Sequence, residues 1–181
     1  IAADLTAAYN TLAHDEGGWG GKVEQVGRQL VYLPSEDRLL VRDRVRAVKA
    51  NSVKKWLLHT VTQPHIENLR VLTGHHDNGI LESDSDIALV QNGRGWLTVQ
   101  RILPQDAVIR LVGGQDYQHY VETDGDDSTL NGVNFNQGAS TQPWFDIGMW
   151  RLEIQPRAAR QEDTFLVVLT PALNAPRRAK A

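Results

Sequence analysis

Short runs in which apolar and polar residues alternate are the dominant pattern of this chain. The clearest run covers residues 149–155, where the two sets are Trp150, Leu152, Ile154 and Arg151, Glu153, Gln155. Successive side chains of a strand point to opposite faces, so this alternation predicts a strand with one core face and one charged face. Similar runs, bounded by Gly, Asn, Asp and Pro, recur along the chain. The predicted strands are Gln25–Leu33, Arg38–Ala47, Lys54–Thr62, Leu69–Thr73, Ile87–Gln91, Trp96–Leu103, Ala107–Val112, Tyr117–Glu122, Met149–Gln155 and Thr164–Leu169.

About ten strands with little helical periodicity predict an all-β fold, a sandwich of two stacked antiparallel sheets. A closed barrel is the alternative. The 181 residues suit one domain, so we assign residues 1–174 to the sandwich and expect a disordered tail over 175–181. Residues 2–12 fit a short helix or an extended segment. Segments 75–86 and 124–142 are rich in Asp, Asn, Gly and Ser, which predicts long surface loops.

Composition removes several classes of function. A net charge of −3 gives no overall attraction for nucleic acid or an anionic membrane, so a polyanion would need a local basic patch. No apolar run approaches the roughly 20 residues of a membrane-spanning helix. The chain has no cysteine, which excludes disulfides and thiolate chemistry. We therefore expect neither a nucleic-acid nor a membrane partner.

A basic stripe is predicted on the strand Arg38–Ala47. Arg42, Arg44 and Arg46 share one face of it by the two-residue period. Guanidinium groups match carboxylate geometry, so this face is a candidate site for a uronate or sulfate polymer. The alternative is that Glu or Asp residues on neighbouring strands neutralise it.

A series of short motifs occurs in order between Ala3 and Pro171. The motifs include Ala3-Asp4-Leu5-Thr6, Val41-Arg42-Asp43-Arg44-Val45, Lys55-Trp56-Leu57-Leu58-His59-Thr60, Gly95-Trp96 before Leu103-Pro104, Val112-Gly113-Gly114, Asn131-Gly132, Trp150-Arg151-Leu152-Glu153-Ile154 and Asp163-Thr164-Phe165-Leu166. Together they resemble the C-terminal β-sandwich part of bacterial heparinase II/III-like polysaccharide lyases.

That resemblance implies cleavage of uronic-acid-containing polysaccharide, heparin/heparan-like or alginate-like, by β-elimination. It also implies an N-terminal α/α toroid in the same protein, which supplies most catalytic groups, and a periplasmic or secreted location. The family's zinc site is expected upstream of Ile1, so no cofactor is assigned to this chain. The chain alone should be inactive and act as a supporting wall for the toroid. The alternative is a non-catalytic carbohydrate-binding or structural module.

Histidines provide the candidates for chemistry within the chain. His59 ends an apolar strand, and it is either a hydrogen-bonded structural group or a cleft-facing residue and thus a catalytic candidate. His75 and His76, with His65 ten residues earlier, raise the question of a zinc site. Adjacent side chains rarely ligate one ion, so a solvated loop is the preferred interpretation.

The remaining candidates lie in predicted loops. Asp124, Asp126 and Asn131 have the spacing of oxygen ligands in a calcium loop, but no bidentate Glu follows, and turn chemistry explains them as well. Trp19 and Trp144 have Gly or Pro nearby and are candidates for stacking on sugar rings. The other three tryptophans, at strand positions, are expected in the core: Trp56, Trp96 and Trp150.

Overall fold

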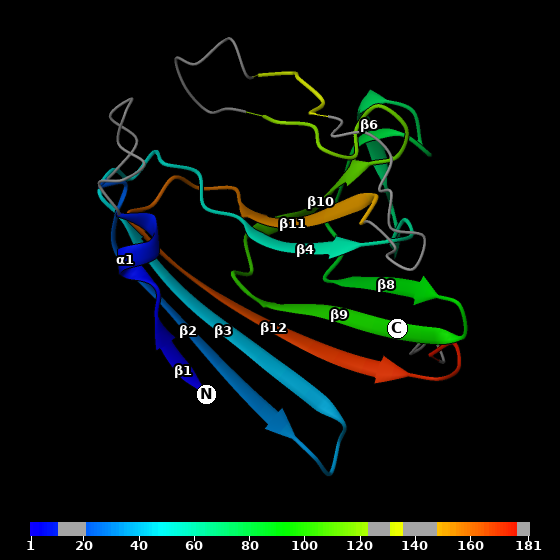
Figure 1. The fold of residues 1–181 in the computed structure, drawn as a ribbon, viewed down its shortest axis with the longest axis horizontal. Helices are drawn as coiled ribbons and strands as arrows, with labels where there is room; N and C mark the ends of the chain where they lie inside the picture. The colour runs from blue at the N-terminus through cyan, green and yellow to red at the C-terminus, as the bar shows by residue number, and fades with distance from the viewer. Residues whose placement is uncertain (11–20, 123–130, 136–147, 177–181) are drawn as a thin grey trace.

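The two-sheet antiparallel sandwich is confirmed in the computed structural model, which describes residues 1–10, 21–122, 131–135 and 148–176 (Figure 1). Within these residues the chain forms twelve strands and one short helix, α1 (Thr6–Tyr9). Every strand pair is antiparallel, and the sheets are separate, so the barrel alternative does not apply.

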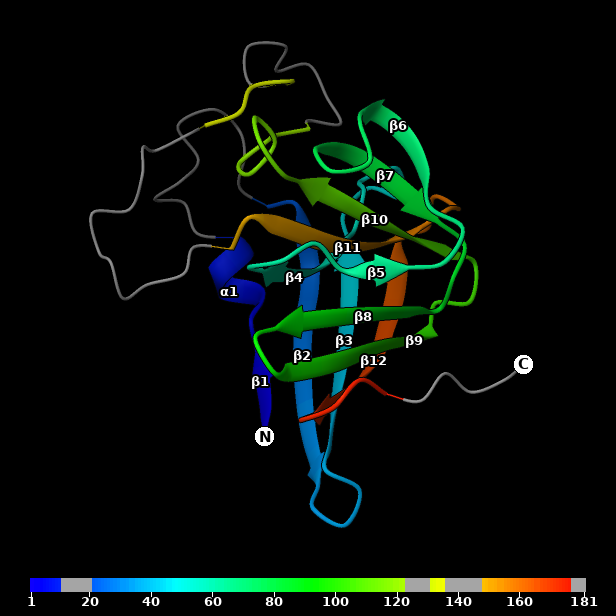
Figure 2. The same ribbon diagram turned by 90° about the vertical axis from the view of Figure 1, so that its right-hand side faces the viewer.

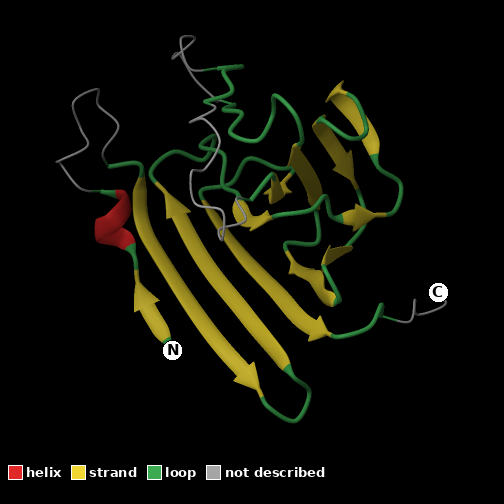
Figure 3. Ribbon diagram, turned by 45° about the vertical axis from the view of Figure 1, so that its right-hand side comes forward, coloured by secondary structure: helices red, strands yellow, loops and turns green. Residues whose placement is uncertain are grey.

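The larger sheet has seven strands in the order β1-β2-β3-β12-β9-β8-β5. Their bounds are β1 Ala2–Asp4, β2 Val23–Leu33, β3 Arg38–Ala47, β12 Glu162–Ala172, β9 Gly95–Leu103, β8 Ile87–Asn92 and β5 His65–Ile66. Figure 3 shows β2, β3 and β12 as its longest members, running side by side. The C-terminal strand β12 therefore lies in the middle of the sheet and joins its two halves.

The smaller sheet has five strands in the order β4-β11-β10-β7-β6. Their bounds are β4 Trp56–Thr60, β11 Trp150–Pro156, β10 Ala107–Gly113, β7 Gly79–Ser83 and β6 Arg70–Gly74. Figure 2 shows this sheet as a second layer against the strands of the larger one.

One hydrophobic core lies between the two sheets. Leu111, Leu152 and Ile154 of the smaller sheet are fully buried, as are Phe165 and Val167 of β12. These residues occupy every second position of their strands, so the alternation seen in the sequence is the pattern that builds the core. At roughly 25 cal/mol per Å² of buried apolar surface, this packing is the main force that holds the sheets together.

Nine of the ten predicted strands correspond to strands of the structure, and one prediction is wrong. Segment 117–122 was predicted as a strand, but it forms turns and a single bridge, Tyr120 to Asn134. The tight turn explains the difference: Gly114 and Asp116 have positive φ, and Tyr117 N donates to Gly114 O at 3.0 Å.

Segment 75–86 was predicted as a loop, but it contains β7. Ile80 is 4% exposed and Leu81 fully buried, so five residues suffice to form a central strand. The apolar run in β7 is short and has polar residues on both sides, so the segment has the composition of a loop. Near the N-terminus, both alternatives occur in succession, with β1 extended and α1 helical.

The central strands β10 and β11 of the smaller sheet are largely buried on both faces, unlike the core-and-wet pattern expected from alternation. Val108 and Val112 of β10 and Glu153 of β11 lie on the face away from the core, yet none is more than 4% exposed. The outward-facing charged residues of β11 are therefore poorly exposed to solvent, and their charges interact more strongly than they would in water.

No helix in the described ranges is long and apolar enough to cross a membrane. Of the predicted disordered tail, residues 177–181 lie outside the described residues.

Candidate functional site

The three arginines of β3 share the outer face of the larger sheet, as their spacing predicts, but two are neutralised. Arg44 forms a forked pair with Glu162 at 2.7 and 2.9 Å. Arg46 Nε lies 2.7 Å from Glu24 Oε2. The hydrogen bond from Arg44 holds the pKa of Glu162 below its usual range. Much of the positive charge of this face is therefore already compensated.

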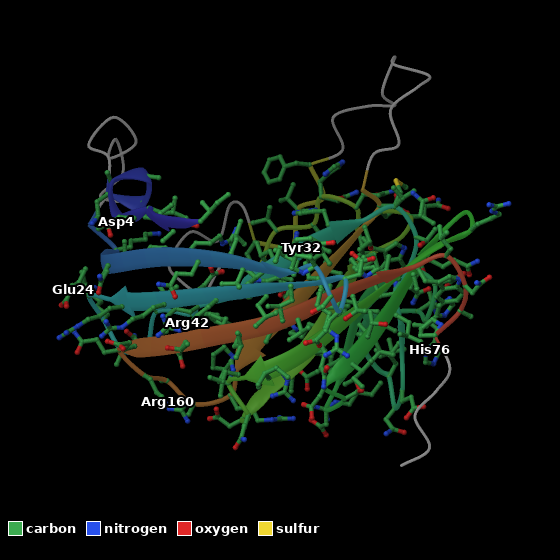
Figure 4. All side chains as sticks on the ribbon, turned by 90° about the horizontal axis from the view of Figure 1, so that it is seen from below. Asp4, Glu24, Tyr32, Arg42, His76 and Arg160 are labelled. Atoms are coloured by element: carbon green, nitrogen blue, oxygen red, sulfur yellow. The ribbon has the colours of Figure 1, made fainter. Side chains whose placement is uncertain are left out.

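Arg42 lies between Gln29 and Leu166 in register and donates to Gln29 Oε1 at 3.0 Å. Within the described ranges it forms no ion pair with a carboxylate. Figure 4 shows it on the middle of β3, away from Glu24 at the end of the sheet. Of the three β3 arginines, Arg42 is therefore the one whose charge no carboxylate of the described residues compensates.

A denser set of charges lies on the smaller sheet, on the face away from the core. One cross-strand row there alternates in sign, in the order Arg70, Glu82, Arg110 and Glu153. Opposite charges on neighbouring strands attract, so the row favours this register. It also brings Arg110 beside Glu153 in the middle of the sheet.

Five charged residues meet around Glu153, and we call them the Glu153 cluster: Lys55, Arg110, Glu122, Arg151 and Glu153. Glu153 is 1% exposed, and its carboxylate lies next to three cationic side chains. Arg151 Nε donates to its Oε1 at 2.6 Å, while Lys55 Nζ and Arg110 Nη1 lie 3.0 and 3.7 Å from its Oε2.

Glu122 is the second carboxylate of the cluster and comes from the segment after β10. Its Oε1 accepts a hydrogen bond from Arg110 Nη2 at 2.8 Å, and its Oε2 lies 3.6 Å from Lys55 Nζ. Burial opposes its ionisation, but the hydrogen bond and the charges of Arg110 and Lys55 outweigh that effect. The pKa of Glu122 therefore lies below its usual range.

Three cationic side chains of low exposure lie together in the cluster. Lys55, Arg110 and Arg151 are only 18%, 11% and 16% exposed. They face Glu122 and Glu153, and Glu82 lies beside Arg110 in the cross-strand row. Three buried atoms, Arg110 Nε, Glu122 Oε2 and Glu153 Oε2, make no hydrogen bond within the described residues. Among them, Arg110 Nε is a donor and suits an acceptor such as a carboxylate oxygen, whereas the two carboxylate oxygens suit a further donor.

His59 adjoins this cluster. It faces away from the core and lies opposite Arg151 across the β4–β11 pair. Partial burial lowers its pKa, and the charges of Arg151 and His119 lower it further, against a smaller opposing effect from Glu153. His59 is therefore neutral at pH 7 and able to accept a proton.

In the Arg151→Gln variant we expect the pKa of His59 to rise, because one source of positive charge is removed, while burial still keeps it below the usual value. A His titration followed by NMR measures the change. Arg44→Gln, on the other sheet, is the control and should leave the His59 pKa unchanged. No change in Arg151→Gln would show that the two side chains are not electrostatically coupled.

His75 and His76 are exposed beside β6, and the described residues contain no group of three or more His, Asp or Glu that could hold a metal ion. Figure 4 places His76 at the opposite end of the molecule from Glu24. Asn131 is exposed, while Asp124 and Asp126 lie outside the described residues, as do Trp19 and Trp144.

Trp56 and Trp150 are 5% exposed in the core, as predicted. Trp96 instead lies opposite Gln91 and alternates with the core residue Leu97, which places it on the outer face of the larger sheet. Its ring centroid is 6.3 Å from that of His65.

A cleft of about 560 Å³ opens between the sheets beside β4. Leu58, Val90, Leu97 and Pro171 give it mainly apolar walls, and His59 also lines it, which agrees with the cleft-facing alternative for this residue. As the described residues line it, no Lys or Arg contributes, and Asp37 adds negative charge. The cleft therefore does not suit an acidic polymer, in contrast to the Glu153 cluster.

The sequence identified the charged face of β11 but not the cluster. Arg151 and Glu153 were recognised as outward-facing, whereas Lys55, Arg110 and Glu122 were not singled out. The strand order β4-β11-β10 brings Lys55 and Arg110 to Glu153, and the segment after β10 adds Glu122 from outside the sheet. Charged residues at outward positions of several apolar strands were the available signal.

No family model matches the chain, and no curated protein matches it. The lyase family is therefore a hypothesis that rests on the ordered motif series.

Proposed function

We propose that the chain is the β-sandwich part of a lyase that cleaves uronic-acid-containing polysaccharide by β-elimination, together with an α/α toroid of the same protein. In this role it holds carboxylates of the substrate and supports the catalytic toroid. The observation that carries the proposal is the Glu153 cluster, a poorly solvated site in which three cationic side chains lie together.

The chemistry of β-elimination favours such a site. The reaction needs a cation to neutralise the uronate carboxylate, a base to remove the C5 proton and an acid to protonate the leaving oxygen. Lys55, Arg110 and Arg151 together supply the positive charge for the first task. His59, neutral at pH 7 and opposite Arg151, is the candidate in this chain for proton removal.

We expect the chain alone to bind a glucuronate-containing hexasaccharide and to release no unsaturated product. Calorimetry measures binding, and absorbance near 232 nm detects the unsaturated uronate. Arg151→Gln should weaken binding about tenfold, the effect of losing one charged contact of about 1.4 kcal/mol. The matched control is Arg38→Gln, which removes an exposed arginine paired with Glu36.

Each other outcome identifies a different function. Product at 232 nm that disappears in His59→Ala would show that the chain is catalytic by itself. Binding that is lost in Arg42→Gln, but kept in Arg151→Gln, would place the polymer on the larger sheet. Absence of binding would contradict the proposal and favour a structural module.

A further inference from the structure

Glu122 differs from the rest of the Glu153 cluster in how it is held. Arg110, Arg151 and Glu153 belong to strands, and Lys55 immediately precedes β4. Glu122 follows the turns after β10 and reaches the cluster from outside the sheet. Its carboxylate is thus the member that can leave without breaking the sheet.

Exposure supports the same distinction. The Glu122 side chain is 24% exposed and that of Glu153 is 1% exposed, so Glu122 lies at the rim and Glu153 at the base. Around Glu122 the sheet contributes the Nη2 donor of Arg110 and the ammonium group of Lys55. A guanidinium group with an ammonium group beside it is a suitable receptor for one carboxylate.

We propose that the position of the Glu122 carboxylate is a binding site for the carboxylate of a uronate residue, and that Glu122 occupies this site until the ligand displaces it. The inference rests on the proposed function and names the ligand group and its two partners, Arg110 and Lys55. The exchange replaces one carboxylate by another, so the charge balance of the cluster stays the same.

Displacement has an energetic consequence that can be measured. A ligand that must compete with Glu122 binds with an affinity reduced by the fraction of time for which the site is open. If Glu122 occupies the site for about nine-tenths of the time, its removal strengthens binding about tenfold. A neutral sugar cannot replace Glu122 and should gain nothing.

The test compares wild type with Glu122→Gln by calorimetry, using a hexasaccharide of alternating glucuronate and N-acetylglucosamine. We expect about tenfold tighter binding in Glu122→Gln and no gain for the same hexasaccharide with its carboxylates reduced to alcohols. Glu36→Gln, which removes an exposed carboxylate paired with Arg38, is the matched control and should bind like wild type.

A second measurement uses wild-type protein, so it holds even if the variant folds poorly. With saturating hexasaccharide, the pKa of Glu122 followed by carboxyl NMR should rise towards its usual value, because the side chain has left Arg110. Equal or weaker binding in Glu122→Gln, or an unchanged Glu122 pKa on binding, would overturn the inference alone. No binding by either protein would contradict the proposed function itself.

Discussion

Replacing Glu153 by glutamine should lower the free energy of unfolding by about 3–5 kcal/mol, the usual cost of removing one partner from a buried ion pair. Glutamine keeps the size of the side chain but removes its charge. Lys55, Arg110 and Arg151 would then face one another with one carboxylate fewer, and Glu122 and Glu82 would remain to compensate them. Urea denaturation followed by circular dichroism measures the loss.

Glu24→Gln is the control, since Glu24 and Arg46 form an ion pair in which both side chains are more than 40% exposed. Its loss should cost about 1 kcal/mol or less. A similarly small loss in Glu153→Gln would contradict the description of the cluster as poorly solvated. It would also remove the electrostatic argument for an anion site.

Local pattern was enough to predict most of the fold. The alternation in Arg38–Ala47 and in residues 149–155 correctly separated core positions from outward ones, since a strand's period depends on its own backbone. The strand prediction for segment 117–122 is wrong because its alternating residues do not pair along a neighbouring strand. β7 was missed because five residues carry too little pattern to be distinguished from a polar loop.

The candidate site depends on information that local pattern does not contain. Glu153 is outward-facing by its period, and only the arrangement of β4, β11 and β10 explains why it is buried and surrounded by cations. In contrast, cross-strand neutralisation was foreseen for the β3 arginines as an alternative, and it occurs at Arg44 and Arg46. Local sequence pattern therefore predicts which segments form strands, but it does not predict the order of the strands in each sheet.

The molecule has a second buried ion pair, which differs from the Glu153 cluster in its charge balance. Lys54 and Asp163 are 8% and 4% exposed, and Lys54 Nζ lies 3.1 Å from Asp163 Oδ2. The same ammonium group donates to the carbonyl oxygens of Ser52 and Arg160. One cation thus connects the segment before β4 with the segment before β12, and the pair itself is neutral.

Lys54→Met should therefore destabilise the protein by about 3–5 kcal/mol, because it leaves the Asp163 carboxylate buried, with Arg160 Nη1 at 3.6 Å as its remaining cation. Adding Asp163→Leu removes that stranded charge, so the double variant should recover most of the loss in urea denaturation. The recovery should be incomplete, because the Ser52 and Arg160 carbonyl oxygens lose a donor. Additive losses would show that the two side chains do not interact. A neutral pair can be replaced by apolar groups in this way, whereas Glu153 is shared by Lys55, Arg110 and Arg151, so no single pair of the cluster can be removed without leaving a charge behind.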